Sequence, residues 1–139
     1  MKFLIFFIFS LLVIFSSCNK DEETSDHNLH HSDDDTSLPV IVLYSPSDSS
    51  VYHNGDTVYI SGTVSDNDLD TGIILIKNDT TAFEYFNQLH EIHTGGTATI
   101  EYMYIVSGIS KNEMITFSVL YSDHTGNPSV LSRKLVFMP

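Results

Sequence analysis

From residue 39 onward, apolar and polar residues alternate with a period of two, which predicts β-strands. Residues 57–65 show it most clearly, because Val58, Ile60, Gly62 and Val64 share one face. The same alternation predicts strands at 98–104, 115–122 and 131–137, where the last one places Leu131, Arg133, Leu135 and Phe137 on one face. Continuous apolar runs predict further strands at 40–44 and 73–76, and residues 82–86 form a weaker candidate for an edge strand or an irregular segment.

Residues that favour tight turns separate these runs. Asn54-Gly55 is the strongest pair, because both residue types tolerate positive φ. Three more turns are expected at 66–68, 95–96 and 126–128, and no segment of ten residues carries a helical stripe. About seven short strands in a domain at 39–139 are the count and size of an immunoglobulin-like antiparallel β-sandwich, so we predict an all-β fold.

The first 17 residues have a different character. Lys2 is followed by thirteen residues of which only Ser10 is not apolar. As a helix this run would be about 20 Å long, short of the roughly 30 Å core of a bilayer. A charged start, a short apolar run and the small pair Ser16-Ser17 favour a cleaved signal peptide at 1–17 over an anchor helix that stays uncleaved.

Cys18 is the only cysteine, and it stands where this signal peptide would end. The stretch resembles the bacterial lipobox, although Phe15 occupies a position where leucine is commonest. The resemblance implies that Cys18 is the lipid attachment site and the mature N-terminus, with two acyl chains that give stable anchoring to a membrane. With one cysteine the chain has no internal disulfide, so core packing must hold the domain.

Residues 18–38 are expected to form a flexible tether. Among residues 19–38, seven acidic residues accompany a single lysine, and only Leu29 and Leu38 are apolar. Such a segment buries too little apolar surface to offset its ordering entropy. Its start, Cys18 to Glu23, resembles the lipoprotein export signal of Bacteroidota, which implies the outer leaflet of the cell outer membrane. An ordinary acidic linker and a periplasmic orientation are the alternatives.

Net charge limits the partners. The full chain has a formal net charge of −12 at pH 7. Removal of the leader takes away only Lys2, which leaves five basic residues against 18 acidic ones and a net charge of −13. Such a chain should repel nucleic acid and anionic lipid headgroups. We therefore expect no nucleic-acid partner.

Several stretches together are similar to bacterial Ig-like repeats. They are residues 39–46, ending in Ser-Pro, the Gly-Asp turn and strand at 55–62, the Asp-rich 64–69, and the strand and hairpin at 117–128. The nearest likeness is to Bacteroidota lipoprotein-borne Ig-like domains of unknown function. Within the hairpin, Asp123 is expected to accept hydrogen bonds from turn backbone groups, and Gly126-Asn127 to supply the special backbone angles. Tyr121 lies near the corner tyrosine of such sandwiches.

Seven histidines raise the question of a metal. His27, His30 and His31 lie in the tether, whereas His90 and His93 fall in a stretch expected to be a loop after the fourth strand. The His90-Glu91-Ile92-His93 spacing is one residue short of the zinc-protease motif. With His53 and His124 in other turns, a site would form only if those loops converge. Solvated loop histidines are the simpler expectation, so no metal and no cofactor are predicted.

Residues 66–70 resemble the first half of a calcium loop. Thr71 stands where the glycine belongs and Lys77 where the glutamate belongs, which excludes a helix–loop–helix site. An interstrand calcium site is the alternative to a plain acidic turn.

No pattern for an enzyme is present. The sequence lacks Gly-x-Ser-x-Gly, a glycine-rich phosphate loop and a second cysteine. An aromatic group is expected to belong to the core rather than to a sugar-binding platform: Phe83, Tyr85, Phe86, Tyr102 and Tyr104. Thr57 and Thr80 each follow an aspartate, as in the short triplets that Bacteroidota O-glycosylate.

These observations predict a surface-exposed lipoprotein, anchored to the membrane at Cys18, whose Ig-like domain is a noncatalytic binding or spacer module. A protein or a glycan would be bound through loops or an exposed strand edge. One alternative is a His-rich envelope protein that binds zinc, copper or nickel, and another is a purely structural envelope component.

Overall fold

The computed structural model describes residues 36–139, which form six β-strands and no helix. The strands are β1 (Val40–Ser45), β2 (Ser50–His53), β3 (Thr57–Asn78), β4 (Glu84–Ile105), β5 (Glu113–Asp123) and β6 (Pro128–Met138). The expected signal peptide, Cys18 and all but the last three residues of the expected tether lie outside the described residues. Within those residues, no helix is long and apolar enough to cross a membrane.

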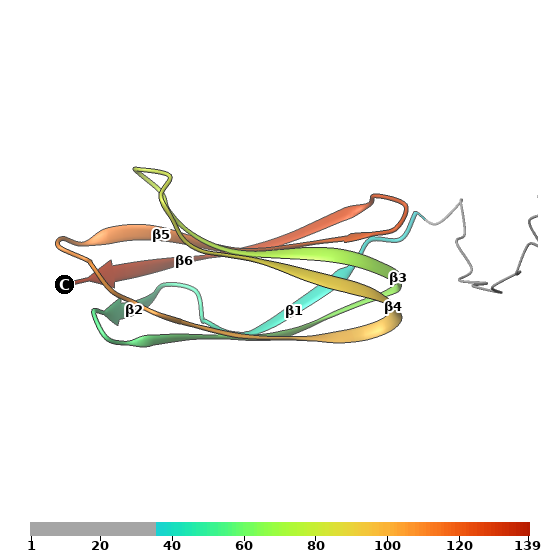
Figure 1. Cartoon of the computed structure of the whole chain (residues 1–139), viewed down its shortest axis with the longest axis horizontal. Coiled ribbons are helices and arrows are strands. Elements are labelled where there is room, and N and C mark those ends of the chain that lie inside the picture. The colour runs from blue at the N-terminus through green and yellow to red at the C-terminus, as the bar shows by residue number, and fades with distance from the viewer. Residues whose placement is uncertain (1–35) are drawn as a thin grey trace, which may run out of the picture.

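The strands form two layers, and β3 and β4 run through both (Figure 1). In the first layer, β1 pairs with residues 61–65 of β3, which also pair with the second half of β4. In the second layer, residues 69–78 of β3 lie between the first half of β4 and β5, and β6 and β2 follow β5. This is the strand order of an immunoglobulin-like sandwich, so the predicted fold class is confirmed.

The predicted alternation is confirmed on every long strand. Val58, Ile60 and Val64 point into the core, and Ile115, Phe117, Val119 and Tyr121 of β5 do the same. The faces of β3, β4, β5 and β6 meet between the layers in one hydrophobic core. This burial stabilises the domain without a covalent cross-link, at roughly 25 cal/mol per Å² of apolar surface.

Two expected turns are instead parts of continuous strands. Residues 66–68 lie within β3 and residues 95–96 within β4, so each long strand contains two of the predicted short ones. The ladder shifts register between Asp66 and Leu69, which is how turn-forming residues are accommodated in a paired strand. Gly96 adopts φ +108, and a Cβ at Gly95 would lie 2.4 Å from the carbonyl oxygen of Asn67. Only glycine permits this approach of the two strands.

The other two expected turns are confirmed. Gly55 has φ +95 in the turn between β2 and β3, and Gly126 has φ +86 in the turn between β5 and β6. Asp123 accepts hydrogen bonds from the backbone N–H of Asn127 at 2.8 Å and from the Thr125 hydroxyl at 2.9 Å. Burial would raise the pKa of Asp123, but these bonds to its carboxylate outweigh that effect and lower the pKa.

Arg133 is the one charged residue on the predicted inner face of β6, and its position follows from its hydrogen bonds. Its guanidinium donates to the carbonyl oxygen of Leu43 at 2.8 Å and to that of Pro46. These two carbonyls flank the Ser45–Pro46 peptide, which is cis, where the chain leaves β1 for β2. Arg133 therefore joins the first layer to the second at this corner.

Candidate functional site

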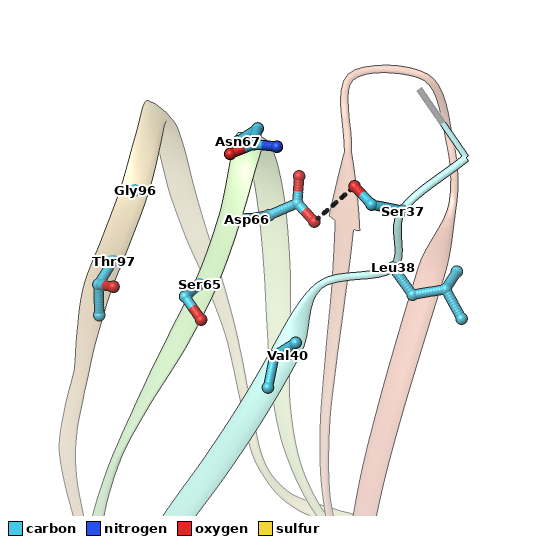
Figure 2. Close-up of a pocket in the computed structure, with 8 residues that line it drawn as sticks. All are labelled: Ser37, Leu38, Val40, Ser65, Asp66, Asn67, Gly96 and Thr97. Atoms are coloured by element: carbon cyan, nitrogen blue, oxygen red, sulfur yellow. Dashed lines mark hydrogen bonds between the residues drawn. The ribbon is translucent and has the colours of Figure 1, made fainter. Parts of the chain in front are cut away.

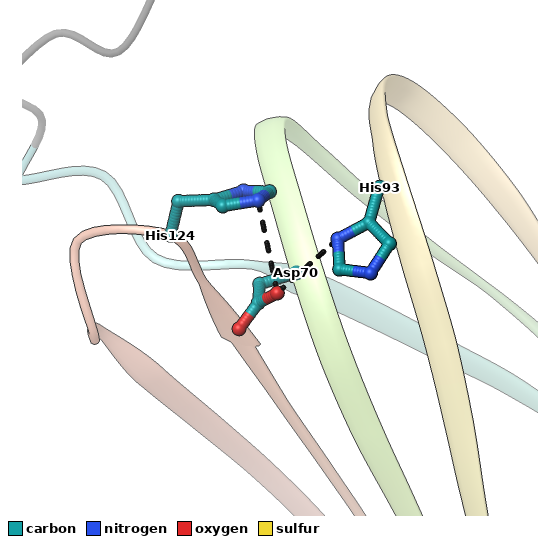
Figure 3. A group of neighbouring side chains, drawn as sticks. All are labelled: Asp70, His93 and His124. Atoms are coloured by element: carbon teal, nitrogen blue, oxygen red, sulfur yellow. Dashed lines mark ion pairs between the residues drawn. The ribbon is translucent and has the colours of Figure 1, made fainter. Parts of the chain in front are cut away.

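Three side chains that could hold a metal ion meet at one end of the sandwich: Asp70, His93 and His124. Figure 3 shows the Asp70 carboxylate between the two imidazole rings. Its Oδ1 lies 3.4 Å from Nδ1 of His93 and 3.7 Å from Nε2 of His124. The ligand atoms of the three residues all lie within 4.8 Å of one another. Two of the predicted histidine positions therefore converge on one carboxylate.

The fold brings these residues together through an irregularity in β3. Asp70 follows Leu69 and precedes Thr71, and between these two residues the register shifts in both ladders, toward β4 and toward β5. Asp70 consequently has no Cα partner in either neighbouring strand. Such bulges re-aim a side chain out of the regular alternation. Here the carboxylate faces His93 of β4 on one side and His124, just after β5, on the other.

His124 is held in place by Asp68. The backbone N–H of His124 donates to the Asp68 carbonyl oxygen at 3.0 Å, and Nδ1 of the ring lies 3.0 Å from the Asp68 carboxylate Oδ1. The side chains of His124 and Asp68 are only 28% and 17% exposed. Because Nδ1 faces Asp68, Nε2 is the nitrogen presented to Asp70.

His90 has a different role from His93, although the two are three residues apart. Both lie in β4 and not in the expected loop, so strand alternation turns His90 toward the core and His93 toward solvent. Nδ1 of His90 shares a hydrogen bond of 2.6 Å with the Tyr121 hydroxyl, and burial lowers the pKa of His90. The histidine pair of the sequence is therefore not a ligand pair.

The hydroxyl of a corner tyrosine forms a hydrogen bond with the backbone. The Tyr121 hydroxyl instead forms its hydrogen bond with the His90 side chain. Burial raises the pKa of Tyr121 far above the ordinary value of 10.0. His90, Gly72 and Tyr121 stand opposite one another across three strands, and a Cβ at Gly72 would lie 2.1 Å from the Tyr121 ring. The missing side chain at Gly72 makes room for the tyrosine.

His53 lies apart from the other histidines of the described region. It is exposed at the end of β2, with Nδ1 3.7 Å from Oδ2 of Asp56. The tether histidines His27, His30 and His31 lie outside the described residues.

In the stretch expected to resemble half of a calcium loop, the carboxylates of Asp66 and Asp68 contact other groups of the protein. Oδ1 of Asp66 accepts the backbone N–H of Asp68 at 3.1 Å, and its Oδ2 is 3.4 Å from the Ser37 hydroxyl. Figure 2 shows this contact, and the eight residues drawn there line an open hollow with a volume of about 320 Å³. Asp68 faces His124, so the two carboxylates do not point at a common ion.

Most of the aromatic group belongs to the core, as expected. Tyr85, Phe86, Tyr102 and Tyr104 pack against it, whereas Phe83 is 60% exposed and meets Tyr85 edge to face. The Tyr85 hydroxyl donates to Glu113, and burial together with this carboxylate raises the pKa of Tyr85 to about 12.

Of the two threonines in O-glycosylation triplets, Thr80 is the more accessible. It lies in the exposed turn after β3, whereas Thr57 is half-buried at the start of that strand. Modification of Thr80 remains a prediction.

Comparison with known proteins adds two distant structural likenesses. No known protein family matches the chain, and no curated protein does. The crystal structure of an engineered protein aligns with 73% of this chain, at 12% identity and a TM-score of 0.44, and the chain spans 20% of that protein. The structure of murine CRIg aligns with 72% of this chain and 96% of its own, at 10% identity and a TM-score of 0.40.

Proposed function

We propose that this chain is a lipoprotein of the cell envelope, held at Cys18 in the outer leaflet of the outer membrane, whose Ig-like domain is a noncatalytic binding module. The sequence supports the anchor, through a short apolar leader that ends at the only cysteine and an acidic stretch behind it. The structure supports the binding role, through the longest unpaired strand edge of the described residues.

That edge belongs to β4. Over its 22 residues β4 pairs with β3 alone among the described strands, so a row of backbone N–H and C=O groups faces outward along both layers. Natural proteins usually protect such edges with lysine, proline or very short strands. β4 contains neither lysine nor proline, and its residues 97–105 pair with β3 without a register shift, which leaves this part of the edge able to accept an added strand.

The side chains of β4 indicate which partner would fit. Its charged residues are Glu84, Glu91 and Glu101, all exposed, and it has no arginine. Leu89 and Met103 add exposed apolar surface. An extended protein segment that alternates basic and apolar residues matches this edge in hydrogen bonding, charge and hydrophobicity.

A photo-crosslinking amino acid at Thr99, an exposed position of β4, tests the binding role in the native host. The matched control carries it at Ser118, a partly exposed position of β5 that pairs with β3 on one side and with β6 on the other. We expect Thr99 to yield a discrete adduct with an envelope protein and Ser118 to yield none. Equal labelling, or none, would favour a spacer or purely structural role, and glycan adducts would replace the protein partner.

The anchor has its own test. Cys18→Ser removes the proposed lipid attachment site, so we expect the variant to leave the membrane fraction and to lose metabolic labelling by palmitate. Protease treatment of intact cells should degrade the unsubstituted domain. Survival of the domain until the outer membrane is ruptured would place it on the periplasmic side.

One end of the domain receives the chain segment that would carry such an anchor. The chain enters β1 at the end of the sandwich where the β5–β6 turn lies, and it leaves at the opposite end (Figure 1). Ser37 lies against Asp66 at the entry end. Asp70, His93 and His124 lie at this same end of the domain, and β6 ends at the opposite one.

A further inference from the structure

We propose that Asp70, His93 and His124 bind one divalent transition-metal ion of the zinc, copper and nickel class, with Asp68 as the positioning residue for His124. The site goes beyond the binding role of the β4 edge and depends on three side chains, of which only that of His93 belongs to β4. Its evidence is the spacing of the ligand atoms, the orientation of one imidazole and the chemistry of the donor set.

The spacing fits a shared ion better than direct hydrogen bonds. Ligand atoms about 2.0–2.2 Å from a tetrahedral ion lie about 3.4 Å from each other. The separations of 3.4 and 3.7 Å around Asp70 Oδ1 come close to that value. They exceed the roughly 2.7–3.2 Å of ordinary hydrogen bonds. The His93 side chain is 60% exposed, so its ring has room to close the remaining gap to His124.

The orientation of His124 is the second argument. Metal-binding histidines almost always donate their other ring N–H to a carboxylate or a carbonyl oxygen, which selects the tautomer. Nδ1 of His124 lies 3.0 Å from the Asp68 carboxylate and 3.3 Å from the Asp68 carbonyl oxygen. Asp68 therefore leaves Nε2 to carry the lone pair toward Asp70.

The donor set selects the class of ion. Two imidazoles and one carboxylate suit zinc, copper and nickel, whereas calcium and magnesium require oxygen ligands. Three protein ligands leave a coordination position for water or for a partner's side chain. The ion would also join β3, β4 and the turn after β5, a cross-link in a chain that has no internal disulfide.

Calorimetric titration of the full chain in detergent with Zn²⁺ at pH 7.5 tests this site. The parent for all comparisons carries His27→Ala, His30→Ala and His31→Ala, so that the tether cannot supply the heat. We expect it to bind one Zn²⁺ per chain and to give no heat with Ca²⁺. His93→Ala, His124→Ala and Asp70→Asn should each abolish the Zn²⁺ heat.

Two further variants give the test its specificity. Asp68→Ala should weaken Zn²⁺ binding about 10- to 100-fold and keep the stoichiometry, as for a residue that orients a ligand. His53→Ala, which removes an exposed histidine beside an aspartate elsewhere, should change nothing. Thermal unfolding without metal checks that each variant is folded, and added Zn²⁺ should raise the midpoint only where His93, His124 and Asp70 are intact.

The proposal fails if the parent without tether histidines gives no heat. It also fails if His93→Ala or His124→Ala binds Zn²⁺ as the parent does, or if Ca²⁺ binds equally well. Crosslinking from β4 is a separate measurement, so failure of the metal site and failure of the binding role are distinguishable.

Discussion

At the residue scale, the burial of His90 against Tyr121 makes the stability of the domain depend on pH. His90 is half-buried between the rings of Tyr102 and Tyr121, with centroids 5.8 Å away in both cases. Burial disfavours the charged imidazolium and lowers the pKa of His90 below 6.5. The neutral ring is therefore part of the native structure.

This sets the sign of one pH dependence. Above pH 6.5, His90 is neutral in the unfolded chain as well as in the native one. The native contacts of the neutral ring therefore contribute fully to the free energy of unfolding. As the pH falls through 6.5 toward the lower native pKa, the unfolded chain binds a proton that the native chain does not, and stability decreases. Denaturant unfolding at pH 7.5 and 5.5 should show a smaller loss in His90→Gln than in the unsubstituted chain. An identical loss would contradict the assignment.

Gly72 is needed for a steric reason. A Cβ there would lie 2.1 Å from the Tyr121 ring, and that ring is fully buried. We expect Gly72→Ala to lower the free energy of unfolding by about 1–3 kcal/mol, the usual cost of overpacking a core. In the background of Tyr121→Ala the same change should cost much less, because the obstacle is gone. If the effects of Gly72→Ala and Tyr121→Ala on the free energy of unfolding were additive, Gly72 would be required for the backbone conformation and not for the space that Tyr121 occupies.

At the scale of elements, Arg133 links β6 to the corner between β1 and β2. It donates to the carbonyl oxygens of Leu43, where the register between β1 and β3 shifts, and of Pro46, which follows β1. Arg133→Met keeps much of the side-chain volume and removes both hydrogen bonds. Hydrogen bonds from charged groups contribute about 1.5–3 kcal/mol, so we expect a loss in that range in denaturant unfolding.

The neighbouring residue provides the control. Lys134 forms an exposed ion pair with Asp79 at 2.7 Å, and exposed ion pairs contribute about 0–1 kcal/mol. Lys134→Met should therefore change stability less than Arg133→Met does. The reverse order would show that the corner is held by something other than Arg133.

At the scale of the whole molecule, the continuity of β3 and β4 has a consequence for unfolding. Each strand takes part in both layers, so neither layer has a complete set of strands without the other. We expect a single cooperative transition, with far-UV circular dichroism and tyrosine fluorescence giving the same midpoint.

A substitution confined to the first layer sharpens this expectation. Val64→Ala truncates a buried residue of β3 beside β1. The tyrosines that report by fluorescence include Tyr85, which packs against Phe137, and Tyr121, which packs against His90. Both signals should shift to the same lower midpoint. Two separated transitions would show that the layers unfold independently.

Local patterns in the sequence determined much of this domain. Alternation identified the buried faces of β3, β5 and β6, because burial on one side of a strand imposes a period of two. Asn54-Gly55 and Gly126-Asn127 marked real turns, since only residues that tolerate positive φ fit there. The charge and the lone cysteine of the proposed anchor are also properties of the sequence alone.

Tertiary structure decided what depended on distant partners. β2 is four residues long and exists because it pairs in parallel with β6, more than 80 residues later, which no local pattern encodes. Residues 66–68 and 95–96 have turn-forming composition, yet pairing between β3 and β4 converts them into irregular strand. The bulge at Asp70 then turns its carboxylate toward His93 and His124, which are 23 and 54 positions away in the chain. Such a site arises from register, and register is set by how strands far apart in sequence bury their faces together.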